Sequence, residues 1–373
     1  MGVEQLSHRI QAHLSGEHMT DQDLTQTLSE LIADAARQGR PLEIRGGMTK
    51  SFYGRAVSGD PLDMTPHRGI IDYEPTELVL TARAGTPLSE IQQLLQANGQ
   101  MLPFEPPAFG PEATLGGTVA SGLSGPRRPY AGAVRDAVLG VRMINGLGEV
   151  LHFGGQVMKN VAGYDVSRVM AGSLGTLGVL LEVSVKVLPR PAHSLTIVQP
   201  ASAIRALDSL LGWGNRPLPL SAACHLDDTL HVRLCGARQG VEQAAQVIGG
   251  DAMENAEAFW EGIREQTHPF FQGSGAPLWR LSLPPGAPAD LVPEQCLLDW
   301  GGGLRWFRSQ GPADAIRQAT QAEGGHATVF RGHGGRIEPF HPLAPPLLQL
   351  HRQLKAAFDP HGILNPGRLY PEV

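Results

Sequence analysis

The sequence predicts an α+β fold built from more than one domain. A chain of 373 residues is longer than one typical domain, and its 42% of hydrophobic residues can form a sizeable core. Short strands and helices alternate from residue 21, and after Pro191 the pattern changes to strand-rich segments separated by helical patches. The chain closes with a helix and a proline-rich tail, PLLQLHRQLKAAFDPHGILNPGRLYP. We therefore expect a lead-in at 1–20, a first domain at 21–190, a second at 191–342, and a segment at 343–373 that returns to the first domain.

Hydrophobic periodicity, glycine and proline predict the elements of the first domain. DQDLTQTLSELIADAARQG predicts a helix that starts at an aspartate, and PLEIRGG predicts a strand that runs into a glycine turn. GIIDYEPTELVLTARAG contains two strands. TPLSEIQQLLQANG predicts a helix capped by Thr86, with Pro87 at its first position and a glycine stop. AVLGVRMINGLGEVLHF predicts a hairpin around Asn-Gly, and LGVLLEVSVKVLPRP a strand closed by two prolines.

The second domain has a different sequence pattern, with more strand-like runs. SLTIVQP, SAACHL, TLHVRLCG, LWRLSLP and CLLDWGGGLRWF are typical of strands. Helical patches near 201–212, 238–249 and 312–323 lie between them. Strands and helices in this alternation indicate an α+β domain.

Charge and cysteine usage exclude several classes of protein. A formal net charge of −6 argues against nucleic acid as a partner. Cys224, Cys235 and Cys296 form no C-x-x-C motif, so neither a disulfide framework nor an iron–sulfur cluster is encoded. The most apolar stretch, 176–189, is interrupted by Glu182 and Lys186. We expect a cytoplasmic protein that meets a membrane, at its inner face, only through partner proteins.

Glycine is concentrated in three stretches that we interpret as one ligand site. IRGGMTKSFYG spans 44–54, ATLGGTVASGLSG spans 113–125 and AGSLGTLGVL spans 171–180. Buried pyrophosphate must exchange water for backbone amides, and these approach closely only where no Cβ intervenes. None of the three stretches matches G-x-G-x-x-G or G-x-x-x-x-G-K-[ST] in its required context, so the two standard nucleotide folds are disfavoured. Taken alone, a Gly-Gly stretch is more often a tight turn than a ligand site.

These motifs, in this order, resemble the FAD-binding domain of the vanillyl-alcohol-oxidase/PCMH type. The tail FDPHGILNPGRLYP is similar to the D-lactate and glycolate dehydrogenase branch of that family. The resemblance covers roughly residues 22–190 and 343–370. It implies a PCMH-type FAD-binding domain of two α/β subdomains at 21–190, a ferredoxin-like α+β cap domain on the substrate side at 191–342, and a C-terminal segment that packs on the FAD domain.

The resemblance also implies which residues bind FAD. The first loop would hold the pyrophosphate, the second would contact pyrophosphate, ribityl chain and flavin, the third would close around the adenosine half, and the NPG motif would lie near the flavin ring. In that order the residues are Gly46, Gly47, Met48, Thr49, Lys50 and Ser51; Thr114, Leu115, Gly116, Gly117, Ser121 and Gly122; Gly163, Tyr164, Gly175, Gly178 and Val179; and Asn365. Some relatives attach flavin covalently through a histidine in the first loop. Met48 and Thr49 stand at that place here, so we expect non-covalent FAD.

The catalytic residues are less clear from the sequence. Oxidation of a 2-hydroxy acid needs a hydride acceptor, a base and a cation for the carboxylate. Metal-using relatives supply part of this with histidine-rich motifs, but DWGGGLRW at 299–306 and EGGHATVFRG at 323–332 lack the paired histidines. We therefore predict no catalytic metal and interpret His326 as structural. The candidates for a carboxylate site are Arg305, Arg308, Arg331 and His333.

The resemblance implies an FAD-binding subunit of a glycolate oxidase or dehydrogenase complex. Such a subunit oxidises glycolate, or a similar 2-hydroxy acid, to glyoxylate beside a larger paralogous FAD subunit, and electrons pass to an iron–sulfur subunit. Two alternatives remain open: a non-catalytic FAD-holding or electron-relaying partner of the larger subunit, and a stand-alone D-2-hydroxy-acid dehydrogenase. A reductase of the same fold that uses NADPH is disfavoured by the NPGR tail. We consider Trp300, Trp306 and Phe307 as a surface on which a partner could dock.

Overall fold

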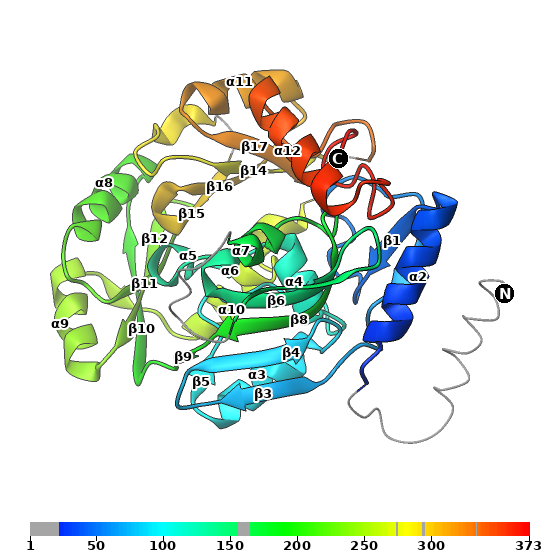
Figure 1. The fold of residues 1–373 in the computed structure, drawn as a ribbon. Helices are drawn as coiled ribbons and strands as arrows, with labels where there is room; N and C mark the ends of the chain where they lie inside the picture. The colour runs from blue at the N-terminus through cyan, green and yellow to red at the C-terminus, as the bar shows by residue number, and fades with distance from the viewer. Residues whose placement is uncertain (1–21, 156–164, 274, 293–294, 333) are drawn as a thin grey trace.

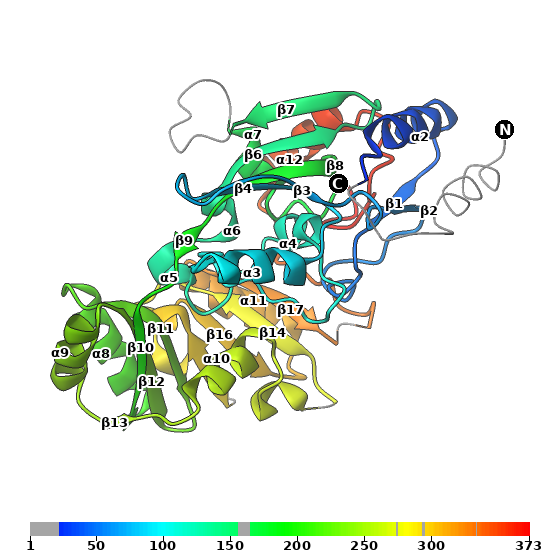
Figure 2. The same cartoon turned by 90° about the horizontal axis from the view of Figure 1, so that it is seen from below.

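The computed structural model describes residues 22–155, 165–273, 275–292, 295–332 and 334–373. The chain forms two parts, one around a five-stranded sheet and one around an eight-stranded sheet. In Figure 2 the five-stranded sheet lies above the larger sheet, and helices α3 and α4 lie between them.

The first part covers the region for which the sequence predicts an FAD-binding domain, and we use that name for it below. Its five-stranded sheet has the order β3-β4-β8-β6-β7, with every neighbouring pair antiparallel. A separate parallel pair, β1-β2, lies beside α2, and β5 pairs with β9. The strands are β1 (Leu42–Arg45), β2 (Asp60–Asp63), β3 (Ile70–Glu74), β4 (Val79–Arg83), β5 (Gln100–Met101), β6 (Val138–Ile144), β7 (Val150–Gly154), β8 (Val179–Lys186) and β9 (Leu188–Pro189). The helices are α2 (Thr25–Gln38), α3 (Leu88–Ala97), α4 (Leu115–Ser121), α5 (Arg128–Ala131), α6 (Val134–Ala137) and α7 (Val166–Met170).

Local sequence accounts for most of these elements. Helix α2 buries the apolar stripe formed by Leu28, Ile32 and Ala35, and it ends at Gly39, whose φ of 62° is the left-handed conformation that glycine tolerates. The prediction for the start of α3 was wrong in one respect. Pro87 occupies the cap position, because the Thr86 hydroxyl donates to the carbonyl oxygen of Gly69 at 3.1 Å instead of capping the helix.

The second part, the cap domain, contains two ferredoxin-like halves joined edge to edge (Figure 1). The order β13-β10-β12-β11 and the mirrored order β15-β16-β14-β17 each repeat the ferredoxin-like arrangement. Strands β11 and β15 join the two halves of the sheet, through the pairs Cys224–Asp299 and His225–Leu298. The strands are β10 (His193–Pro200), β11 (Leu220–Leu226), β12 (Thr229–Gly236), β13 (Asp251–Ala252), β14 (Leu278–Ser282), β15 (Cys296–Asp299), β16 (Leu304–Arg308) and β17 (His326–Arg331). The helices are α8 (Ala203–Gly214), α9 (Arg238–Ile248), α10 (Ala256–Arg264) and α11 (Ala313–Ala322), with 3₁₀ turns at Pro269–Gln272, Ala289–Leu291 and Trp300–Gly302.

The C-terminal segment returns to the FAD-binding domain. Helix α12 (Pro345–Phe358) ends beside the loop 176–178, where the Lys355 ammonium donates to the carbonyl oxygen of Thr176 at 2.8 Å and of Leu364 at 2.6 Å. The Asp359 carboxylate lies 2.8 Å from the same ammonium and accepts hydrogen bonds from the amides of Ile363 and Leu364. These buried contacts fix the tail along β1.

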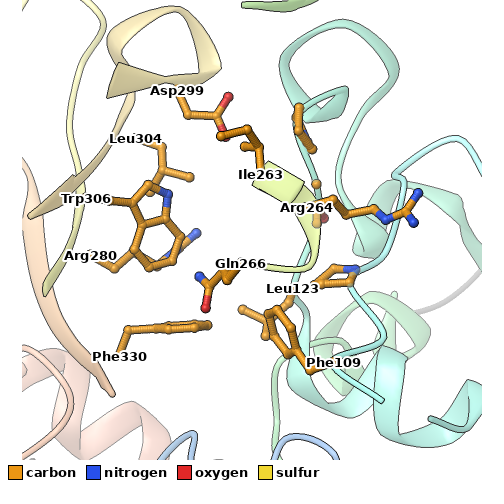
Figure 3. Close-up of a pocket in the computed structure, with 14 residues that line it drawn as sticks. Phe109, Leu123, Ile263, Arg264, Gln266, Arg280, Asp299, Leu304, Trp306 and Phe330 are labelled. Carbon is orange, nitrogen blue, oxygen red and sulfur yellow. The ribbon is translucent and has the colours of Figure 1, made fainter. Parts of the chain in front are cut away.

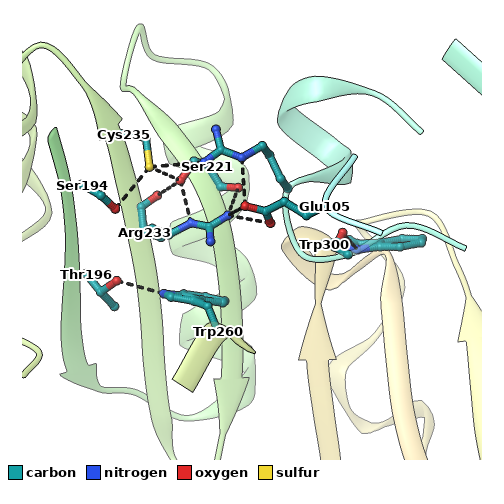
Figure 4. A network of polar contacts seen from close by, with 10 residues as sticks. Glu105, Ser194, Thr196, Ser221, Arg233, Cys235, Trp260 and Trp300 are labelled. Carbon is teal, nitrogen blue, oxygen red and sulfur yellow. Dashed lines mark hydrogen bonds and ion pairs between the residues drawn. The ribbon is translucent and has the colours of Figure 1, made fainter. Parts of the chain in front are cut away.

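A buried polar network joins the two domains (Figure 4). Arg233 on β12 donates to both carboxylate oxygens of Glu105, at 2.8 and 2.9 Å, and Arg127 donates to the same carboxylate at 3.1 Å. Burial raises the pKa of Glu105, but the charges of Arg233 and Arg127 outweigh burial and hold the pKa below its ordinary value. The indole of Trp300 adds a hydrogen bond of 3.0 Å to the carbonyl oxygen of Gly125.

Candidate cofactor and substrate site

Two adjoining pockets form one cleft in the FAD-binding domain. The cleft lies between the loop after β1, the first turns of α4, the loop 173–178 and the C-terminal tail. Residues predicted to bind FAD that line it are Gly46, Gly47, Met48, Thr49, Lys50, Ser51, Thr114, Gly116, Gly117, Ser121, Gly175, Gly178 and Asn365. The structure therefore brings the three glycine stretches and the tail motif to one place.

The loop after β1 is suited to an anionic group. A Cβ on Gly47 would lie 1.5 Å from the carbonyl oxygen of Glu112, so this position requires glycine. A Cβ on Gly46 would lie 2.7 Å from the Thr114 hydroxyl, which would have to move. Within the described part of the chain, the backbone amides of Gly46, Gly47 and Met48 donate to no protein acceptor. Amides left free beside a cleft are the donors that a pyrophosphate needs.

Lys50 adds a positive charge at the inner end of this loop. Its ammonium donates to the carbonyl oxygen of Ala108 at 3.1 Å and lies 5.7 Å from the centre of the Phe109 ring. Burial lowers the pKa of Lys50 to about 8, although the nearby carboxylate of Glu265 opposes the shift. A bound anion would stabilise the charged form further.

The glycines of the third stretch serve different purposes. Gly172 and Gly175 have φ values of 89° and 75°, which side chains rarely adopt. Gly178 directly precedes β8, which pairs with β6. A Cβ added at Gly178 would lie 2.0 Å from the terminal methyl of Met143 on β6. Two of the glycines thus shape the turn, and the third permits close strand packing beside the cleft.

Asn365 holds three segments of the cleft together. Its side-chain oxygen accepts a hydrogen bond from the Ile44 amide at 2.8 Å, and its side-chain amide donates to the carbonyl oxygen of Leu174 at 2.7 Å. It is 5% exposed and has a φ of 41°, a conformation that asparagine tolerates better than most residues. The side chain therefore fixes β1 and the third glycine stretch to the tail.

We expect Asn365→Asp to lower the free energy of unfolding by about 1–3 kcal/mol, because the carbonyl of Leu174 loses its buried donor and faces a carboxylate. Chemical denaturation of the FAD-free chain measures this difference. Asn98→Asp is the matched control: Asn98 donates to the carbonyl of Leu94 at 2.9 Å but is exposed, so its loss should cost less than about 0.5 kcal/mol. Equal losses in the two variants would show that Asn365 does not fix the tail.

The remaining predicted cofactor residues do not line the cleft or lie outside the described part. Leu115 and Val179 are fully buried in the hydrophobic cores. Gly122, with φ of 65°, ends α4 against Gly172. Gly163 and Tyr164 lie outside the described residues.

Sequence reasoning missed Arg368 among the residues of the cleft. Its guanidinium donates to the carbonyl oxygens of Ser51, Tyr53 and Arg55, at 3.0, 2.8 and 2.6 Å. It therefore supports the first glycine loop from the opposite end of the chain. The NPG motif indicates Asn365, and the arginine that follows it in the NPGR tail is the signal that could have indicated Arg368.

The candidate catalytic residues do not form one carboxylate site. Arg305 is fully buried, and its guanidinium donates to the carbonyl oxygens of Ala287 and Pro288, on the face of β16 opposite to Leu304 and Trp306. Its side chain thus points away from the FAD-binding domain. Arg308 donates to the carbonyl oxygens of Phe271 and Ala276, at 2.6 and 2.9 Å.

Arg331 lies nearer to the domain interface. Its guanidinium lies 3.5 Å from the centre of the Phe52 ring and donates to the Gln266 side chain at 3.0 Å. Burial and the charge of Arg308 lower the pKa of Arg331 to about 10. His333 lies outside the described residues, and among the described ones no three His, Cys, Asp or Glu side chains are grouped as metal ligands.

The proposed aromatic docking surface is wrong. Trp300, Trp306 and Phe307 are 6%, 7% and 1% exposed. Trp300 and Trp306 belong to the core between the domains, and Phe307 stacks on Trp279 within the cap domain. Over the described ranges, no helix has the length and apolar character to cross a membrane.

Comparisons with known proteins show the family of this chain. The family model described as "FAD binding domain" matches residues 23–154, and the one described as "FAD linked oxidases, C-terminal domain" matches residues 342–369. The Escherichia coli (strain K12) glycolate oxidase subunit GlcE is 50% identical over 94% of this chain and 99% of that protein. The Bacillus subtilis (strain 168) glycolate oxidase subunit GlcD is 27% identical over 47% of this chain and 37% of that protein. A solved structure of alkyldihydroxyacetonephosphate synthase superposes with a TM-score of 0.64 at 14% identity, covering 91% of this chain and 74% of that one, and supports the fold.

The fold and the cleft thus define a flavoprotein oxidoreductase with a PCMH-type FAD-binding domain. FAD is its cofactor, and it is an FAD-dependent hydroxy-acid dehydrogenase in class. Within that class, the chain belongs to the family of the glycolate oxidase subunit GlcE.

Proposed function

We propose that this chain is the FAD-binding subunit of a glycolate oxidase complex that oxidises glycolate, or a similar 2-hydroxy acid, to glyoxylate. The identity to GlcE along nearly the whole chain carries this proposal, together with the cleft that gathers its glycine stretches. The similarity to GlcD supports a larger paralogous flavin subunit as a partner.

The chain's own residues would hold the cofactor. The free amides of Gly46, Gly47 and Met48 and the ammonium of Lys50 suit the pyrophosphate, and the side chain of Asn365 fixes the walls. When bound, FAD supplies the acceptor for the electron pair of the substrate's carbon–hydrogen bond. The protein must also orient the acid and take the hydroxyl proton.

Electrons must leave through another subunit. The thiol of Cys224 is buried, and Cys235 and Cys296 lie on different strands, so these three cysteines do not form a cluster site. We include an iron–sulfur subunit in the proposal as the electron acceptor.

A second candidate function is an FAD-holding or electron-relaying subunit, with the chemistry in the larger partner. The engagement of Arg305 and Arg308 with backbone carbonyls favours it, because neither guanidinium is free to hold a substrate carboxylate.

Anaerobic addition of glycolate or D-lactate to the purified, FAD-loaded chain distinguishes these functions. Bleaching of the flavin band in the isolated chain would establish that this subunit oxidises the acid. Bleaching only after the partner subunits are added would support the second function. No flavin in either the chain or the complex would overturn both.

We expect FAD to be released when the holoprotein is denatured. The first loop presents Met48 and Thr49 to the cleft, and neither side chain forms a covalent bond to flavin. Acid precipitation followed by absorbance of the supernatant measures the released fraction. Flavin that remains in the pellet would contradict non-covalent binding.

A further inference from the structure

A second cavity lies between the FAD-binding domain and the cap domain (Figure 3). Phe109 and Leu123 line it from the FAD-binding domain, and Arg280, Trp306 and Phe330 line it from the large sheet on the opposite side. The carboxyl of Asp299 lies at one end. Of these residues, the sequence analysis singled out Trp306 alone, as part of a docking surface, and none of them lines the cleft described above.

Arg280 is a partly buried cation that has no polar partner among the described residues. Its guanidinium lies 5.2 Å from the ring of Trp300 and 5.9 Å from that of Trp306. Across the described ranges, its side chain forms no hydrogen bond and no ion pair, although a guanidinium carries five donors. Burial lowers the pKa of Arg280, because the charged form loses water that the indole rings replace only in part. An anion in the cavity would satisfy these donors.

Asp299 is a carboxyl that can exchange a proton near neutral pH. It ends β15, is 3% exposed, and accepts one hydrogen bond of 2.7 Å from the Trp300 amide. Burial raises its pKa to about 7, while the Trp300 amide and the charges of Arg233 and Arg280 oppose the shift. The titratable groups that face it are Arg280 on β14, Arg233 on β12, Cys224 on β11, Tyr130 on α5 and Glu105 in the loop before α4. Arg233 is paired with Glu105, and Arg264, which also lines the cavity, is paired with Glu265. Of the described arginines that line the cavity, Arg280 is therefore the one available to a ligand.

The cavity and the FAD cleft meet at one wall. Lys50 lines the cleft, and its ammonium lies 5.7 Å from the ring of Phe109, which lines the cavity. The lining segment 123–126 follows directly after α4, whose first turns line the cleft. A molecule in the cavity would therefore lie close to a cofactor in the cleft.

We propose that this cavity binds the carboxylate of a small 2-hydroxy acid through Arg280, with Asp299 placed to accept the hydroxyl proton. The proposal rests on the function proposed above and names the site at which it occurs. Oxidation of the acid breaks the O–H bond of its hydroxyl group and the C–H bond of the adjoining carbon, and turns the C–O bond into C=O. Asp299 would accept the hydroxyl proton, and FAD, when bound, would supply the acceptor for the hydrogen that leaves carbon with its electron pair.

Binding of an unreactive carboxylate to the FAD-loaded full chain tests the site without catalysis. Oxamate is a suitable probe because it has the carboxylate but no oxidisable hydroxyl group. Calorimetry measures its Kd, and quenching of tryptophan fluorescence reports on Trp300 and Trp306. We expect Arg280→Gln to raise the Kd by about 10–100-fold, the effect of losing a hydrogen-bonded charge. Arg205→Gln, an exposed arginine on α8, is the control and should leave the Kd unchanged.

The pH dependence tests Asp299 separately. A bound carboxylate repels ionised Asp299, so binding should weaken by up to about tenfold for each pH unit above 7 in the unmodified chain. Asp299→Asn keeps the acceptor for the Trp300 amide and should remove this dependence. If Arg280→Gln fails to fold, the pH dependence of oxamate binding in Asp299→Asn tests whether the cavity binds the carboxylate.

The results of these experiments test the cavity as a carboxylate site independently of the proposed function. Oxamate binding that is absent, or that is unaffected in a folded Arg280→Gln chain that retains FAD, overturns the site even if glycolate bleaches the flavin. Binding that depends on Arg280 and Asp299 supports carboxylate recognition by the cavity. If glycolate nevertheless fails to bleach the flavin of the chain or the complex, the oxidation is wrong and carboxylate recognition stands.

Discussion

Asp359→Ala is expected to lower the free energy of unfolding by about 3–5 kcal/mol, the usual cost of leaving a buried charge without its partner. Lys355 is 7% exposed and keeps only two backbone carbonyls when the carboxylate is removed. The amides of Ile363 and Leu364 lose their acceptor in the same substitution. Denaturant unfolding monitored by circular dichroism gives the difference.

Two further variants isolate the cause. Asp34→Ala removes a half-exposed carboxylate that pairs with Arg37 and Arg40 and accepts from Gln38, and it should lower the free energy of unfolding by no more than about 1 kcal/mol. The double variant Lys355→Met, Asp359→Leu removes both charges and should be less destabilised than Asp359→Ala alone. A double variant as unstable as the single one would show that the helix end, and not the unpaired ammonium, sets the loss.

Gly47→Ala is expected to abolish FAD retention. The added Cβ would lie 1.5 Å from the carbonyl oxygen of Glu112, and a backbone atom cannot yield as a flexible side chain can. The loop must move, which displaces the free amides of residues 46–48 from the cleft. The ratio of FAD to protein after gel filtration measures the effect.

Gly212→Ala provides the matched control for this glycine. Gly212 lies in α8 of the cap domain, and an added Cβ there meets nothing within 4 Å. The Gly212→Ala variant should retain FAD fully, and its helix α8 should be slightly more stable. FAD retained by Gly47→Ala at the level of Gly212→Ala would remove the first loop from the cofactor site.

The fold was predictable where local patterns decide it. The hairpin of β6 and β7 follows from two β-rich runs around Asn-Gly, and the strands of the cap domain follow from their apolar runs. The doubling of the ferredoxin-like unit was not predicted, because it depends on the pairing of β11 with β15, which are separated by about 70 residues. Helix α10 and strand β17 were also missed as elements.

In the candidate site too, the residues that local sequence determines could be predicted, and those that depend on the assembled structure could not. The glycine stretches could be found because each needs backbone without a Cβ, and that need is written in the residue type. Arg305 was misplaced because the face on which a strand residue points depends on register, and Leu304 and Trp306 took the face toward the FAD-binding domain. Arg280 and Asp299 could not be found, since only the assembled interface removes their water.

The joining of Asn365 to Ile44 has a consequence for how the protein is made. The cofactor cleft contains residues from both ends of the chain, 321 positions apart at this contact. A ribosome that has translated both domains has therefore not yet delivered the residues that close the cleft. The nascent chain can complete the cleft only after residues 343–373 have left the ribosome, so we expect a chain interrupted before Asn365 to lose FAD more readily than the full chain.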